Sequence, residues 1–119
     1  MKKKISPLLL LLPSLSTFAG GVTIVDATAS PTGSGVYSFA VTLRHTDSGW
    51  DHYADGWEVM APGGELLGKR TLYHPHIDEQ PFTRSLSGVA IPEGVDQVEI
   101  RAHDKLHGYG AKAFRIELR

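Results

Sequence analysis

The chain has 119 residues, a formal net charge of −1 and no cysteine. Without its three leading lysines the chain carries −4, and this mildly acidic charge argues against nucleic acid and anionic lipid as partners, because both attract basic proteins. Without cysteine no disulfide can form, so a hydrophobic core alone must stabilise the fold.

The first nineteen residues have the layout of a secretory signal peptide. Three lysines follow Met1, an apolar block with five consecutive leucines comes next, and small residues end the segment at Thr17 and Ala19. We expect cleavage before Gly20 and export to the periplasm. The block is too short to span a bilayer, and an uncleaved anchor is the alternative. No cysteine follows it, so we expect no thiol-linked lipid anchor.

Residues 20–119 then form the expected mature chain, which is one domain by its length. Removing the three lysines changes its formal net charge from −1 to −4. Short runs of alternating apolar and polar residues, separated by Gly/Pro turns, predict an all-β fold with Trp57 in its core. The expected strands cover residues 22–27, 36–45, 52–60, 65–73, 82–91, 96–102 and 112–118.

Seven short strands with this spacing predict an antiparallel β-sandwich of the immunoglobulin-like or fibronectin III-like kind. A small barrel is the main rival. Gly68 indicates a bulge in the fourth strand. No internal repeat is visible in the sequence.

The six histidines are predicted to meet at one end of the sandwich. If consecutive strands run alternately up and down, the loops after the second, fourth and sixth strands share one end. Those segments contain His45, His52, His74, His76, His103 and His107. The loops at the opposite end are Gly/Pro turns, so the chemistry is expected at the histidine-bearing end.

A Cu(II) or Zn(II) site is one interpretation of this end of the molecule. Imidazole is a common ligand for both ions, and carboxylates complete such sites. The preferred ligands are His74, His76, His103 and His107, followed by His45 and His52, with Asp47, Asp51 and Asp104 as supporting or alternative ligands. No single spacing among them is a diagnostic metal-binding motif.

The alternative hypothesis is an interaction module that binds no metal. His45 shares the face of Leu43, and Asp104 shares the phase of Ile100, so a buried histidine–aspartate pair could join neighbouring loops. Trp50 and Tyr109, with the acidic loop residues, would then contact a protein or a glycan. Trp50 is either such an anchor or a lid over the loops.

We do not expect an enzyme. The sequence has no nucleophile elbow, and a sandwich of this size has little room for a deep cleft. Arg84 is expected either to pair with Glu58 or Glu99 on the sheet surface or to reach the loops and hold Asp78 or Glu79.

Two long stretches carry a resemblance to other proteins. They read "VTLRHTDSGWDHYADGWEV" over residues 41–59 and "LGKRTLYHPHIDEQPFTRSLSGVAIPEGVDQVEIRAHDKLHGYG" over residues 67–110. Both resemble a group of small, uncharacterised secreted proteins of Gram-negative bacteria. The resemblance implies a secreted single domain and brings no established activity.

Overall fold

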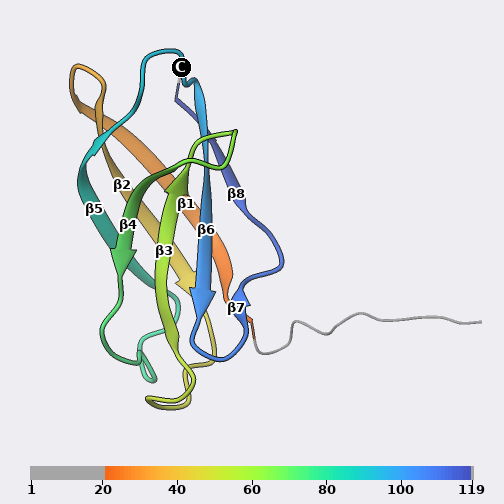
Figure 1. The fold of residues 1–119 in the computed structure, drawn as a ribbon. Coiled ribbons are helices and arrows are strands. Elements are labelled where there is room, and N and C mark those ends of the chain that lie inside the picture. The colour runs from red at the N-terminus through yellow and green to blue at the C-terminus, as the bar shows by residue number, and fades with distance from the viewer. Residues whose placement is uncertain (1–20, 119) are drawn as a thin grey trace, which may run out of the picture.

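Two antiparallel β-sheets make up the part of the chain that the computed structural model describes, residues 21–118 (Figure 1). The strand order is β1-β2-β5 in one sheet and β4-β3-β6-β7 in the other, where β8 also pairs with β6. The strands are β1 (Thr23–Gly33), β2 (Val36–Arg44), β3 (Ala54–Met60), β4 (Leu66–Thr71), β5 (Phe82–Ala90), β6 (Gln97–Asp104), β7 (Gly108–Tyr109) and β8 (Phe114–Glu117). The predicted all-β class is confirmed.

The core lies between the sheets because the strands alternate apolar and polar residues. In β2, Phe39, Val41 and Leu43 are buried. In β6, which belongs to the other sheet, Val98 and Ile100 are buried in the same core. Burying each large apolar side chain contributes about 1.5–3 kcal/mol.

The predicted core tryptophan, Trp57, is fully buried. The bulge expected at Gly68 is present, since the register of β3 with β4 passes from Gly68 directly to Leu66. No helix within residues 21–118 is long and apolar enough to cross a membrane. The predicted signal peptide, residues 1–19, lies outside the described residues.

Two elements differ from the sequence prediction. The first strand continues to Gly33, because its later residues pair with the start of β2, and only residues 34–35 remain for the turn. Gly35 takes a φ of 70°, a conformation that glycine adopts without a steric penalty. The sequence also gave no sign of β7, whose two residues pair with His103 and Asp104.

Three loops gather at one end of the sandwich, the lower end in Figure 1: β2–β3, β4–β5 and β6–β7. They comprise residues 45–53, 72–81 and 105–107. We call this end the histidine pole. The opposite end carries the turns at residues 34–35, 61–65 and 91–96, as strict up-and-down alternation predicts.

Candidate metal centre

His45 lies directly after β2 with its ring between two carboxylates. Its Nδ1 contacts Asp47 Oδ1, its Nε2 lies 2.9 Å from Asp104 Oδ2, and all three side chains are fully buried. A neutral imidazole has one N–H and can therefore donate to only one of these oxygens. The other contact requires a second proton or a metal ion.

Asp104 ends β6 and continues the inward-facing row of Ile100 and Ala102. Its Oδ1 accepts hydrogen bonds from the backbone N–H groups of Leu106, at 3.0 Å, and of His107. The turn therefore fixes Oδ1 and leaves Oδ2 facing imidazole rings. Besides His45, His107 Nδ1 lies 3.1 Å from Oδ2 and His52 Nε2 lies 3.7 Å from it.

The electrostatic surroundings keep the Asp104 carboxyl ionised. Burial raises its pKa, but hydrogen bonds from the His107 backbone and ring and from His45 outweigh burial, so the pKa lies below its ordinary value. At neutral pH this group is thus an anionic donor, as a metal ligand must be.

A small hairpin at residues 48–52 positions His52. Its backbone N–H donates to Gly49 O at 3.1 Å, and Ser48 N–H donates to His52 O at 3.0 Å. The His52 ring lies edge-on to His45, with 4.7 Å between ring centroids. The hairpin tip carries Trp50 and Asp51, and both are exposed.

His45, His52 and Asp104 could hold a metal ion, because one ligand atom from each lies within 4.8 Å of the others. With metal–ligand distances of about 2.0–2.1 Å, neighbouring ligands of a tetrahedral site are about 3.3 Å apart. The distances of 2.9 and 3.7 Å from Asp104 Oδ2 to the two imidazoles lie on either side of that value. His107, whose ring lies 4.9 Å from that of His52, stands beside this group as a further donor.

Asp47 supports the site from the side of His45 Nδ1. Its Oδ1 also accepts the backbone N–H of Ala54 at 3.2 Å, and its Oδ2 accepts that of His76 at 2.6 Å. One buried carboxylate therefore connects the β2–β3 loop to β3 and to the β4–β5 loop.

The rings of His74 and His76 make contacts other than those on Asp104. The His76 ring stacks on Phe82, with centroids 4.0 Å apart, and its Nε2 accepts a hydrogen bond from Arg84 Nη2 at 3.0 Å. Burial lowers the pKa of His76, and the charges of Arg84 and His74 lower it further. His76 is therefore a neutral ring whose Nε2 lone pair is already used. His74 is exposed, and its ring centroid lies 4.9 Å from that of His76.

His103 lies on the outer face of the sheet, because neighbouring residues of a strand point to opposite faces and Asp104 points inward. Its Nδ1 is 2.6 Å from Asp55 Oδ1, and its Nε2 is 3.5 Å from Glu58 Oε2. The hydroxyl of Tyr109 donates to Glu58 Oε1 at 2.6 Å, and this hydrogen bond raises the Tyr109 pKa. We call His103, Asp55, Glu58 and Tyr109 the outer-face cluster; the roles of Asp55 and Glu58 in it were not predicted from the sequence.

The structure thus divides the predicted ligands. It brings His45, His52 and His107 together with Asp104, and it places His74, His76 and His103 elsewhere. Trp50 is 65% exposed and contacts Tyr53 edge-on. Of the two alternatives for Arg84, the structure shows the loop contact, since its Nη2 lies 3.2 Å from Glu79 Oε1.

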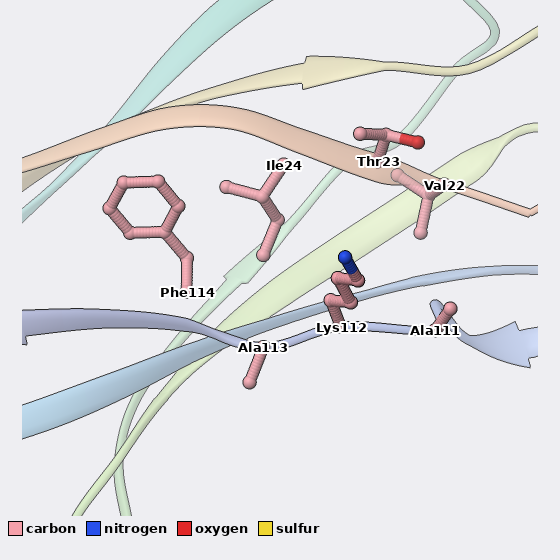
Figure 2. Close-up of a pocket in the computed structure, with 7 residues that line it drawn as sticks. All are labelled: Val22, Thr23, Ile24, Ala111, Lys112, Ala113 and Phe114. Atoms are coloured by element: carbon pink, nitrogen blue, oxygen red, sulfur yellow. The ribbon is translucent and has the colours of Figure 1, made fainter.

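A separate groove of about 360 Å³ lies between the start of β1 and residues 111–114. Figure 2 shows Ile24 and Phe114 reaching toward it from opposite sides. Lys112 is the one charged residue of its lining, which includes no histidine and no carboxylate. The groove is therefore chemically distinct from the histidine pole.

Comparison with known proteins yields one informative relative. A protein of the haloarchaeon Halomicrobium mukohataei, named "Putative lipoprotein", is 44% identical over 94 residues, which make up 79% of this chain and 46% of that protein. This chain thus spans less than half of the relative's length. No family model and no solved structure matches the chain. The resemblance to Gram-negative secreted proteins stays a prediction.

Proposed function

We propose that this protein binds one Zn(II) or Cu(II) ion through His45, His52 and Asp104, with His107 as a fourth donor, and so handles or buffers the metal. One observation carries the proposal. The buried His45 Nε2 faces the anionic Asp104 oxygen at 2.9 Å while Asp47 already accepts from Nδ1. A cation bound by both Nε2 and Oδ2 satisfies both atoms.

The donor types support these two ions. Two or three imidazoles with one carboxylate suit zinc and Cu(II), whereas Cu(I) prefers thiolates and thioethers. The chain has no cysteine, and Met60, at the far end of β3, is not near the histidine pole.

A location in the cell envelope or outside the cell is part of the proposal. The signal-like first nineteen residues support export. The relative's name, which includes the word lipoprotein, supports an envelope location for that protein and, by similarity, for this one. We propose binding without catalysis, since the groove bears none of the histidines or carboxylates.

We also propose that the sandwich is of the immunoglobulin-like kind. The chain passes between the sheets at β2–β3, β4–β5 and β5–β6, and a buried tryptophan lies on the third strand. Both features are typical of that architecture.

Calorimetric titration of the domain with Zn(II) and with Cu(II) tests the proposed function. We expect one ion per chain and a Kd below about 10 μM, which corresponds to about −7 kcal/mol. Mg(II) is the matched control, because it prefers octahedral oxygen ligands and should bind far more weakly. Absence of saturable binding by both transition metals would overturn the proposal.

A second candidate function is a protein or glycan contact at the same pole without metal. It is favoured by large exposed apolar side chains on its three loops, with Trp50 at 65%, Tyr73 at 76% and Leu106 at 65% exposure. Such side chains are common anchors of interfaces. Replacing Trp50 and Leu106 together by serine should abolish co-purification of a partner from envelope extracts and leave the metal titration unchanged. Equal recovery of that partner by the wild type and by the double variant would contradict this candidate function.

A further inference from the structure

Asp47 has the residue type of a metal ligand, but its surroundings give it another role. Its side chain is fully buried. Oδ1 receives the N–H groups of the His45 ring and the Ala54 backbone, and Oδ2 receives the His76 backbone N–H. Three N–H donors therefore surround the two buried oxygens of Asp47.

Asp47 contacts the proposed ligand His45 through the ring nitrogen Nδ1. The ring has two nitrogens, and the one that binds a metal is determined by the hydrogen bond that the other makes. Because Asp47 accepts from Nδ1, a proton stays there, and Nε2, which lies 2.9 Å from Asp104 Oδ2, is the nitrogen that can exchange its hydrogen bond with Asp104 for the metal ion. The corresponding contact of His52, from its Nδ1 to Ser48 Oγ, measures 3.5 Å.

We propose that Asp47 is a positioning residue of the site, which holds His45 with Nδ1 as donor and Nε2 as the metal-binding nitrogen. The inference rests on the proposed function and deepens it. Carboxylate–histidine–metal arrangements are common, and loss of the outer carboxylate typically lowers metal affinity by about 10–100-fold. Here the same carboxylate also joins two loops, so it limits the motion of the ring that it orients.

The segment His74–Pro75–His76 gains a role from this arrangement. The His76 backbone N–H holds Asp47 Oδ2 at 2.6 Å, while the His76 ring is fixed by Phe82 and Arg84. The two-histidine segment therefore supports, through the His76 backbone, the carboxylate that orients His45.

Nitrogen-15 NMR of the zinc-loaded protein tests the inference without any variant. The His45 resonances, assigned by comparison with His45→Gln, should show a proton on Nδ1 and zinc on Nε2. The opposite assignment, with zinc on Nδ1, overturns the role of Asp47. If zinc does not bind at all, the proposed function fails; the inference then depends on whether the hydrogen-bonded Nδ1 proton appears in the metal-free spectrum.

The variant arm compares Asp47→Asn with Asp51→Asn, a neutralisation of the exposed acid on the same loop. Asp47→Asn should weaken zinc binding by about 10–100-fold and shift or broaden the His45 Nδ1 proton signal. Asp51→Asn should keep wild-type affinity and the wild-type signal. If Asp47→Asn folds and retains both, the inference is wrong. If it does not fold, the wild-type spectrum decides.

Discussion

The histidine pole and the outer-face cluster use the same residue types with different results. At the pole, the Asp104 oxygen faces His45, His52 and His107 at 2.9 to 3.7 Å. In the outer-face cluster, a single imidazole, His103, lies between two carboxylates, and a tyrosine hydroxyl occupies one of them.

The two clusters differ in the number of imidazoles that face one carboxylate oxygen. Several imidazoles directed at one anionic oxygen can share a cation with it. In the outer-face cluster, the single imidazole of His103 has its own carboxylate partners, and polar groups in proteins are generally hydrogen-bonded in this way. The number of imidazoles per carboxylate, more than the number of histidines, therefore separates a candidate metal centre from a structural cluster.

The largest effect is expected from Asp104→Asn. The amide oxygen can still accept from Leu106 and His107, so the turn keeps its shape, while an NH₂ group replaces the ligating oxygen. We expect zinc affinity to fall by at least about 100-fold, since loss of an outer carboxylate alone costs about 10–100-fold. Calorimetry measures the change, and circular dichroism checks the fold. Unchanged affinity in a folded variant would show that the pole does not bind the ion through this oxygen.

A paired substitution then sharpens the comparison. His52→Gln should lower zinc affinity by at least about tenfold, or about 1.4 kcal/mol. The matched change on the outer face, His103→Gln, should leave affinity within about twofold, as expected of sites without shared partners. The reverse result would place the metal in the outer-face cluster, where the sequence alone had favoured His103.

The outer-face cluster should respond in stability instead. A Cβ at Gly56 would lie 2.8 Å from His103 Cε1 and 2.9 Å from the backbone oxygen of Arg70. Gly56→Ala should therefore destabilise the domain by about 1–3 kcal/mol, as overpacking does. Urea unfolding measures this loss. Gly63→Ala is the control, because nothing lies within 4 Å of its added Cβ; equal stability of the two variants would contradict the close packing around His103.

The smallest effect concerns pH. The pKa of folded His76 is below 6.5, through burial and the charges of Arg84 and His74. As pH falls through 6.5, His76 binds a proton in the unfolded chain but not in the folded chain. This difference lowers the free energy of unfolding. The stability difference between wild type and His76→Gln should therefore shrink at acidic pH. Urea unfolding over a pH series tests this, and a constant difference would indicate that His76 titrates normally.

Much of the framework was predictable from the sequence. Alternation identified β2 and the inward side of β6, and strand direction alone brought the three loops to one pole. Phase also predicted that His45 and Asp104 turn inward. These properties depend on strand periodicity and hairpin connections, which are local and can be read from one chain.

The grouping within the pole was not predictable. His103 and Asp104 are neighbours at the end of one strand, yet strand alternation places them on opposite faces, so strand direction alone could not show which of the two faces the other imidazoles. His76 has the spacing of a ligand, but Phe82 and Arg84 occupy its ring. Such contacts join segments from different strands, and sequence spacing does not encode them.

Anomalous diffraction at the zinc absorption edge, from crystals of the zinc-loaded domain, tests the central claim most directly. We expect one peak per chain at about 2.0–2.1 Å from His45 Nε2, His52 Nε2 and Asp104 Oδ2. A peak beside His103 or His74, or no peak at the pole at saturating zinc, would contradict it.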